Sequence, residues 1–265
     1  MRTFIFTSIL ISSVLAANAQ EWAAYQKQLI VGMGGGLSMP FKKSETADLM
    51  DARVGYRDRY WGLNPSLQVF VFKKWGFMAD FQIDVSAVNK KQRAMLDQSF
   101  EARYSGDYEI LTDKYFYGHG WQRYESPATF RFTAGPVYRF EKKHFLVYGS
   151  LGLGVTNFEV TGIRANLLRK NSNNYYNVLL DGRGTETPFT VTSGIRIGYR
   201  FSPHLILALN TNAAYFKTDF SQTMTRWDIY TGAAVVDGNF RYQRQHLNFS
   251  TNLNLQVAAN FKKRR

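Results

Sequence analysis

The chain has 265 residues and a formal net charge of +13, with 45% apolar residues, 16% aromatic residues and no cysteine. The lack of cysteine excludes a disulfide scaffold, a cysteine-ligated zinc site and a thiol nucleophile. The apolar content excludes a disordered or collagen-like chain. A slightly negative mean hydropathy argues against a helical membrane bundle but is compatible with a membrane β-barrel, in which apolar and polar residues alternate.

The N-terminal segment has the three parts of a secretory signal peptide. Met1-Arg2 is a basic start, residues 4–16 are an apolar run, and Ala17-Asn18-Ala19 places small residues before a cleavage site. The apolar run is shorter than the ~20 residues that a membrane anchor needs. We therefore predict a signal peptide over residues 1–19 and one β-barrel domain over residues 20–265.

After this segment the dominant periodicity is two. Apolar residues alternate with polar or small ones, as in a strand that separates an apolar medium from a polar one. We predict eight strands, over residues 28–39, 65–73, 76–88, 130–140, 144–158, 189–201, 204–217 and 247–261.

The connections between these strands alternate in length. Three are tight hairpins, at Lys73-Lys74-Trp75, Glu141-Lys142-Lys143 and Ser202-Pro203-His204. The other four are long, at residues 40–63, 89–127, 161–187 and 218–245. Asp237-Gly238 predicts a hairpin turn inside the fourth long connection, so we expect that segment to be a strand extension above the membrane.

An even number of antiparallel strands, with short turns at one end and long loops at the other, is the plan of an outer-membrane barrel. On this pattern the chain resembles the small outer-membrane β-barrel family of OmpA/OmpX-like and porin-like proteins. The resemblance covers the whole mature chain. It implies an all-β fold, an eight-stranded antiparallel up-and-down transmembrane barrel with short periplasmic turns and long extracellular loops.

The same resemblance implies a location in the outer membrane of a Gram-negative bacterium, with outer-membrane lipid and lipopolysaccharide as partners. The chain departs from the family at its C-terminus. The family's last strand ends on an aromatic residue, whereas here Phe261 is followed by Lys262-Lys263-Arg264-Arg265.

The composition of the polar face separates a membrane barrel from a soluble lipocalin-like barrel, which is apolar inside. Within the predicted strands this face carries glycines, amides, Arg and Asp, but no Lys and no Glu. Such residues suit a confined interior better than a water-facing wall. The apolar face carries aromatic residues near both ends of the strands, as in the two interfacial girdles of membrane barrels.

Charged residues on the polar face predict an ion network in the lumen. Its members are Asp80, Asp84, Arg131, Arg139, Arg196 and Arg200. We expect Asp84 and Arg131 to pair, because they lie at similar heights on consecutive strands. The network either plugs the barrel, since eight strands leave room for side chains but not for a channel, or acts as a switchable gate.

The excess positive charge falls on the short turns and the tail. This periplasmic basic rim comprises Lys73, Lys74, Lys142, Lys143, Lys262, Lys263, Arg264 and Arg265, with Glu141 as the one acidic residue. We interpret it as a contact for anionic lipid headgroups or as a docking site for an acidic periplasmic protein. Nucleic acid, which a pI near 9.8 could suggest, is not expected as a partner in this compartment.

The second long loop is rich in aromatic residues, which dominate binding hot spots. The candidates for a loop binding surface are Tyr104, Tyr108, Tyr115, Tyr117, Trp121 and Tyr124. Their ligand would be an extracellular protein or glycan. Alternatively, they pack against neighbouring loops and stiffen a crown over the barrel.

The sequence does not predict catalysis. The four histidines, His119, His144, His204 and His246, are scattered and lack the spacing of a metal site. Barrel enzymes that modify lipid A use a His with a Ser, but His246 and Ser250 are about 13 Å apart along one strand. We expect no enzyme activity, cofactor or metal.

The expected role is therefore envelope structure, adhesion or surface recognition through the long loops. Three alternatives stay open. The chain could be a barrel subunit of an envelope secretion or uptake complex, as in PorT-like barrels of type IX secretion, a lipid A-modifying enzyme, or a narrow pore.

Overall fold

The computed structural model describes residues 27–41, 57–88, 98–111, 128–160, 163–180 and 184–261. The predicted signal peptide and the basic tail after Phe261 lie outside the described residues, as do Tyr115, Tyr117, Trp121 and Tyr124. The described ranges contain twelve strands and a short helix over residues 98–104. No helix within them is both long enough and apolar enough to cross a membrane.

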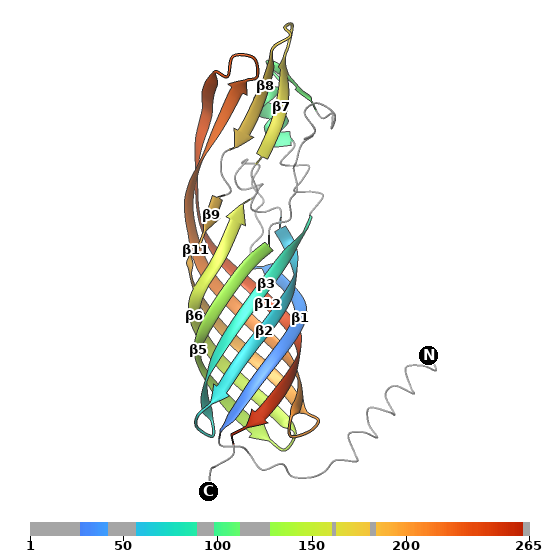
Figure 1. Ribbon diagram of the computed structural model, residues 1–265, viewed down its shortest axis with the longest axis vertical. Coiled ribbons are helices and arrows are strands. Elements are labelled where there is room, and N and C mark those ends of the chain that lie inside the picture. Colours follow the sequence, from blue (N-terminus) through green and yellow to red (C-terminus); the bar gives the residue numbers. More distant parts are fainter. Residues whose placement is uncertain are drawn as a thin grey trace, which may run out of the picture.

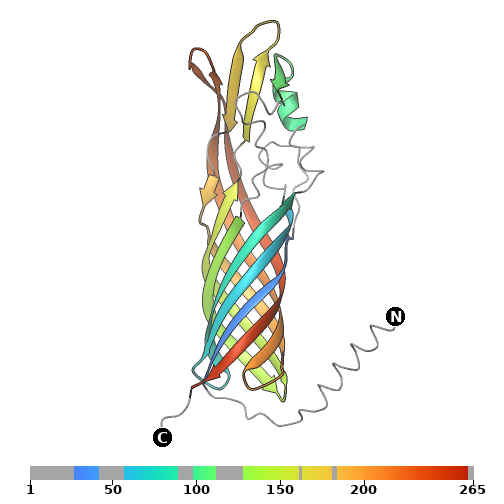
Figure 2. The ribbon, with the colours of Figure 1, turned by 45° about the vertical axis from the view of Figure 1, so that its right-hand side comes forward.

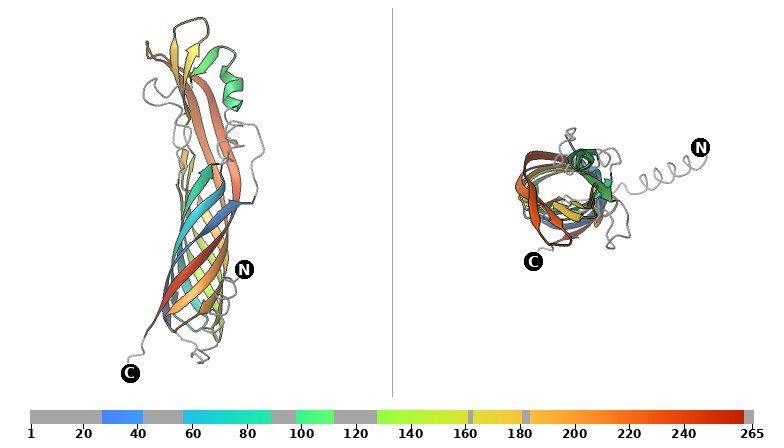
Figure 3. Two further views of the ribbon diagram at one scale, coloured as in Figure 1. Left: turned by 90° about the vertical axis from the view of Figure 1, so that its right-hand side faces the viewer. Right: turned by 90° about the horizontal axis from the view of Figure 1, so that it is seen from above.

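Eight long strands close into a ring (Figure 1; Figure 3, view from above). They are β1 (Gln28–Pro40), β2 (Arg57–Phe70), β3 (Trp75–Val88), β5 (Ala128–Lys142), β6 (Phe145–Val160), β10 (Phe189–Arg200), β11 (Leu205–Asp228) and β12 (Ala234–Asn260). Neighbours in this series pair antiparallel. The ring closes where β1 pairs with β12, Gln28 opposite Asn260. The predicted all-β, eight-stranded antiparallel up-and-down barrel is confirmed.

Three strands are longer than the sequence pattern predicts. β2 begins at Arg57, β11 continues to Asp228, and β12 begins at Ala234. The alternation fades in these parts because they rise above the apolar wall, where the outer face no longer needs apolar side chains. The fourth long connection is therefore mostly strand, as predicted.

The turn between β11 and β12 is at residues 229–233, so the prediction of a turn at Asp237-Gly238 is wrong. The Asp228 carboxylate accepts hydrogen bonds from the backbone N–H groups of Tyr230 and Thr231, at 2.8 and 3.0 Å. Gly232 supplies the left-handed φ of 69° that the turn requires. Asp237 is instead the extra residue of a β-bulge, because Met224 pairs with Gly238 and Thr225 pairs with Val236.

The opposite end of the barrel has only short connections. The three predicted hairpins are confirmed, at residues 71–74, 143–144 and 201–204. In the third, the Ser202 hydroxyl accepts hydrogen bonds from the N–H groups of His204 and Leu205, at 3.3 and 3.1 Å. We call this side of the molecule the turn end.

At the other end the sheet continues above the ring in the order β12-β11-β8-β7-β4. The added strands are β4 (Tyr108–Leu111), β7 (Ile163–Arg169) and β8 (Tyr175–Leu180), while β9 (Gly184–Glu186) pairs with the end of β6. Figure 2 shows the helix over residues 98–104 beside β7 and β8. We call these strands and helix, with residues 217–245 of β11 and β12, the crown.

Candidate functional site: a sealed lumen and a folded crown

The outer face of the barrel is apolar and its inner face is polar. The side chains of Ile195 and Leu253 are 58% and 56% exposed, whereas Arg196 and Asn252, their chain neighbours, are 2% and 0% exposed. Successive side chains of a strand point to opposite faces, and residues paired across two strands point to the same face. The outer face is therefore apolar and the inner face polar around the whole ring. Only an apolar surrounding stabilises such an outer wall.

Exposed aromatic residues lie at both ends of the apolar wall. Toward the turn end they are Phe77, Phe140, Phe145, Phe201 and Phe261, and toward the crown they are Phe130, Phe189 and Tyr215. Two such girdles, short turns on one side and long extensions on the other are the features of an outer-membrane barrel. The turn end is then periplasmic and the crown is extracellular.

The lumen is filled by side chains, and the glycines of β1 make this possible. A Cβ atom on Gly34 would lie 2.2 Å from Asn254 Oδ1, and one on Gly36 would lie 1.9 Å from the carbonyl oxygen of Thr251. The inward amide side chains of β12 therefore lie across β1. The middle of the barrel is packed with amide and hydroxyl groups rather than open.

Two sets of ion pairs cross the lumen. In the middle layer Arg196 Nη2 lies 3.3 Å from Asp80 Oδ1, and its Nη1 donates to the Ser66 hydroxyl at 3.3 Å. Near the turn end Arg200 Nε donates to Glu141 Oε1 at 3.0 Å, and Arg139 Nε lies 3.9 Å from Glu141 Oε2. All of these charged side chains are less than one-tenth exposed.

Glu141 is a lumen residue that the sequence analysis placed on the rim. It belongs to β5 and shares the inward face with Arg139 and Arg131. The period-two pattern could have found it, because Glu141 follows Arg139 by two residues. The predicted strand ends at residue 140 and leaves Glu141 out, whereas β5 extends to Lys142 and brings this glutamate onto the polar face.

The expected direct pair between Asp84 and Arg131 is not among the ion pairs of the described residues. Asp84 Oδ1 instead accepts hydrogen bonds from the Ser38 hydroxyl at 2.9 Å and from Gln82 Nε2 at 2.7 Å. The register explains the difference, because Arg131 lies opposite Gln82 rather than Asp84. Arg131 is thus diagonal to both Asp80 and Asp84.

Apolar clusters close the lumen at both ends. At the turn end the fully buried members include Ile30, Phe70, Val137, Leu146 and Ile206. The Arg139 guanidinium lies over the Phe70 ring, 4.2 Å from its centroid. At the crown end Phe158 and Phe216 continue directly into the core of the crown. Apolar clusters therefore flank the polar middle at both ends.

His246 lies in the upper seal and does not approach Ser250 as a catalytic pair would. Its Nε2 is 2.9 Å from the Thr218 hydroxyl, and its ring stacks on Phe216 with centroids 4.7 Å apart. Ser250 lies four residues farther along β12 on the same face, with Asn248 between them, and is buried. Within the described ranges no group of acidic or histidine residues could hold a metal ion.

The crown has its own hydrophobic core. Its buried members are Phe100, Tyr104, Ala165, Leu167, Val178, Met224 and Tyr242, which come from the helix, β7, β8, β11 and β12. Segments from the second, third and fourth long connections thus share one core. The crown is therefore a folded unit, as expected if aromatic residues of the second long loop pack against neighbouring loops.

One carboxylate, Asp237, joins three of these segments. It accepts hydrogen bonds from Arg226 Nε and Nη2 at 3.1 and 3.2 Å and from the Tyr104 hydroxyl at 2.7 Å. Its backbone oxygen accepts a further bond from Arg103. The Arg226 guanidinium also lies over the rings of Tyr108 and Tyr176, 5.0 and 5.4 Å from their centroids. We call this cluster the Asp237 node.

Tyr104 and Tyr108, two of the predicted binding residues, belong to this node. Tyr104 is buried in the crown core, and Tyr108 is half-buried beside it. Burial, and then the adjacent Asp237 carboxylate, raises the pKa of Tyr104 above its ordinary range. The hydroxyl therefore stays protonated as a donor to Asp237.

The exposed apolar side chains of the crown lie at its tip instead. Tyr230 is 69% exposed, and Val235 and Val236 are also exposed. Tyr175 contacts Tyr230, with ring centroids 6.4 Å apart. Sequence analysis missed this tip patch because the prediction placed the turn at Asp237-Gly238, which would have hidden the valines within a strand.

The turn end carries the described part of the basic rim. Lys73, Lys74, Lys142 and Lys143 are exposed, as is Lys27 at the start of β1. Arg139, near the end of β5, is bonded to the β2–β3 turn. Its Nη2 donates to the Lys73 carbonyl at 2.9 Å and its backbone N–H to the Lys74 carbonyl at 2.7 Å. With Glu141 directed into the lumen, no carboxylate of the described turns faces these lysines.

No protein-family model and no curated protein matches this sequence. Solved structures do resemble it in fold. The outer membrane protein OprG from Pseudomonas aeruginosa is 10% identical, over 90% of this chain and 99% of its own, with a TM-score of 0.42.

Two further matches are of the same kind. Neisserial surface protein A is 8% identical over 87% of this chain and 95% of its own, with a TM-score of 0.40. Ail, the attachment invasion locus protein of Yersinia pestis, is 11% identical over 87% and 99%, with a TM-score of 0.37. At these scores the likeness carries no functional argument, and the assignment as a membrane barrel rests on the strands, wall and lumen of this chain.

Proposed function

We propose that the chain is a non-catalytic outer-membrane protein that recognises a protein or glycan outside the cell through the tip patch of its crown. The observation that carries this proposal is the construction of the crown. A hydrophobic core and the Asp237 node hold three connections in one arrangement, so a ligand would not have to order loose loops.

The tip patch supports the proposal because it combines a rigid position with exposed apolar side chains. Tyr230, Val235 and Val236 are exposed at the β11–β12 hairpin, which lies in the crown, far from the turn end (Figure 1), and water would otherwise surround them. An exposed apolar patch on a stable platform is a common feature of interaction sites. An aromatic ring such as Tyr230 is also a frequent contact at the centre of such sites.

Cells that display the chain should adhere to arrays of immobilised glycans and surface proteins more strongly than cells that lack it. Tyr230→Ala combined with Val236→Ser should reduce this adhesion about tenfold, because a central aromatic contact and an apolar neighbour are removed. Thr223→Ala, on the exposed face of β11 outside the patch, is the matched control. Equal adhesion by both variants and the unaltered chain would contradict the proposal.

Two of the alternatives have direct tests. A narrow pore would need a path through both apolar seals, so the unaltered protein should give no single-channel conductance in planar bilayers. A lipid A-modifying enzyme would need a nucleophile and base in contact, which His246 and Ser250 are not. Lipid A mass spectra from cells with and without the protein should therefore be the same.

The remaining alternative, a subunit of an envelope secretion or uptake complex, would use the basic rim to hold a periplasmic partner. It predicts that the barrel leaves the membrane in a stable larger assembly after mild detergent extraction. A lone barrel on size-exclusion chromatography favours the recognition role instead.

A further inference from the structure

We propose that the periplasmic side of the barrel binds one anionic phospholipid of the inner leaflet, with its phosphate at Lys73 and Lys74 and an acyl chain in a groove of the outer wall. This inference concerns the opposite end of the molecule from the crown and does not depend on the proposed recognition role. Two separate features, a charged turn and an apolar groove, lie on the same strands and together define the site.

The headgroup part of the site is the turn between β2 and β3. Lys73 and Lys74 stand between the exposed apolar side chains of Phe72 and Trp75. Aromatic residues at this level lie in the membrane interface, so the two ammonium groups are at the depth of lipid phosphates. Lys142 and Lys143 on the next turn add to the same positive arc, whereas the β10–β11 turn has no charged side chain.

Arg139 fixes the position of this turn. It donates to the carbonyl groups of Lys73 and Lys74 from the neighbouring strand β5, and Glu141 and Gln28 hold its side chain. Since Glu141 points inward, it does not neutralise the lysines. Among the described residues no carboxylate pairs with these lysines, so the turn presents two cations on a rigid support.

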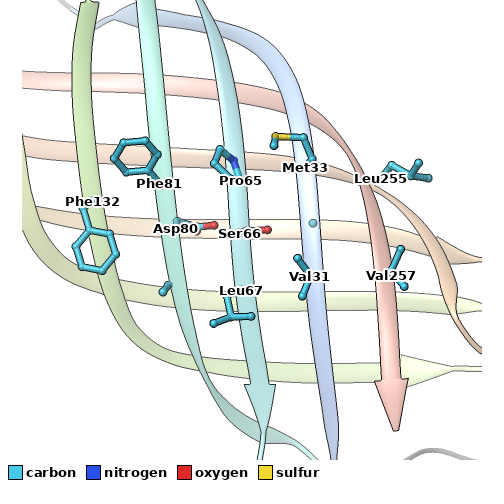
Figure 4. Close-up of a pocket in the computed structure, with 12 residues that line it drawn as sticks. Val31, Met33, Pro65, Ser66, Leu67, Asp80, Phe81, Phe132, Leu255 and Val257 are labelled. Carbon is cyan, nitrogen blue, oxygen red and sulfur yellow. The ribbon is translucent and has the colours of Figure 1, made fainter.

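The acyl part of the site is a groove in the outer wall of β12, β1, β2, β3 and β5, with a volume of about 600 Å³. Its walls are apolar, and they include Val31, Met33, Leu67, Phe81, Phe132 and Val257. Figure 4 shows these side chains in two rows. The groove exists because the small side chain of Ala79 stands between larger outward neighbours.

The height of the groove above the β2–β3 turn matches the hydrocarbon thickness of one leaflet. Leu67 lies on the same strand as the β2–β3 turn, roughly 15 Å higher than Lys73 once the strand rise and a tilt of about 40° are counted. One leaflet has about 15 Å of hydrocarbon. A phospholipid whose phosphate contacts Lys73 and Lys74 would therefore place the end of its acyl chain in the groove, and its negative charge complements the turn.

Native mass spectrometry of the full chain, released from mixed micelles of phosphatidylglycerol and phosphatidylcholine with identical acyl chains, tests this site. The unaltered protein should retain one phosphatidylglycerol about tenfold more often than phosphatidylcholine, since each lysine near an anionic headgroup favours binding severalfold. K73Q/K74Q should abolish this preference. K170Q/K217Q, which removes two exposed lysines from the crown, should retain it.

The groove has its own pair of variants. Ala79→Phe fills it and should reduce retained phosphatidylglycerol severalfold. Gly149→Phe places the same side chain on β6, where the outer wall is open, and should have no effect. Unchanged retention in Ala79→Phe, or equal retention of both lipids by the unaltered chain, would overturn the proposal. The unaltered chain could instead bind a polyglutamate peptide and show no lipid preference. If K73Q/K74Q then lost the peptide, the turn would be a binding site for an acidic protein rather than a lipid.

Discussion

The lumen and the crown both bury charged side chains, but different structures hold them in place. In the lumen, Arg196 and Asp80 face each other across a ring whose backbone closes through hydrogen bonds of all eight strands. In the crown, Asp237 collects Arg226 and Tyr104 on a ribbon that is paired through an open sheet. The hydrogen-bonded ring therefore fixes the barrel backbone, whereas the arrangement of the crown depends on its own hydrophobic core and on the Asp237 carboxylate.

This difference predicts that the loss of a charged side chain from the lumen lowers the free energy of unfolding of the barrel. The fold of the crown should not change. Glu141→Ala removes the carboxylate shared by Arg139 and Arg200, which are then buried with excess positive charge. We expect a loss of about 3–5 kcal/mol in the free energy of unfolding of the barrel. Urea titration in lipid vesicles, followed by the heat-dependent shift on a detergent gel, measures it.

Lys142→Ala is the matched control for this experiment, since its side chain is exposed on the adjacent position. It should unfold at the same urea concentration as the unaltered chain. A Glu141→Ala barrel with unchanged stability would contradict the expected cost of burying Arg139 and Arg200 without their shared carboxylate.

Asp237→Ala should separate the two regions. It leaves Arg226 without its carboxylate and Tyr104 without its acceptor, so we expect the crown to open more easily by about 2–3 kcal/mol. Hydrogen exchange should become faster in residues 98–104 and in β8, while the barrel strands keep their protection. Asp219→Ala removes an exposed carboxylate paired with Arg241 and should change neither region. Equal acceleration in the barrel would contradict an independent crown.

Tyr104→Phe gives a smaller effect with a pH signature. At neutral pH the loss of one hydrogen bond to Asp237 should weaken the crown by about 1 kcal/mol. Because the pKa of Tyr104 is raised in the folded crown, this contribution is present below the ordinary tyrosine value of 10.0 and is lost as the pH rises above it.

Hydrogen exchange of residues 98–104 between pH 9 and pH 11, corrected for the intrinsic exchange rate, measures this effect. The difference between the unaltered chain and Tyr104→Phe should shrink toward pH 11. A constant difference across this range would contradict the role of the Tyr104 hydroxyl.

The sequence predicts the barrel well because its two faces meet different media. Hydrocarbon on one side and a packed polar lumen on the other impose the period of two on residues such as Ile195, Arg196, Asn252 and Leu253. The same pattern identifies all six predicted lumen charges as inward-facing. It does not identify their partners, since the Asp84–Arg131 prediction depends on register, and register is set by pairing across strands.

The crown is less predictable because no membrane orders its surfaces. The sequence predicts the extensions of β11 and β12, but it also predicts a turn at Asp237-Gly238, which favours a hairpin and here forms a bulge. The role of Asp237 depends on Tyr104, which is far from it in the sequence, and on Arg226, which lies on another strand. Such long-range contacts leave no local pattern.

The central claim is that hydrocarbon surrounds the face that bears Ile195 and Leu253, while the face that bears Asn252 is sealed. Because the chain has no cysteine, a nitroxide label can be attached to a single introduced cysteine at each position in lipid vesicles. Labels at 195 and 253 should collide with oxygen and not with a water-soluble nickel chelate, and a label at 252 should be protected from both. Access of the chelate to positions 195 and 253, with oxygen-rich lipid contact at 252, would contradict the fold, its location and its role together.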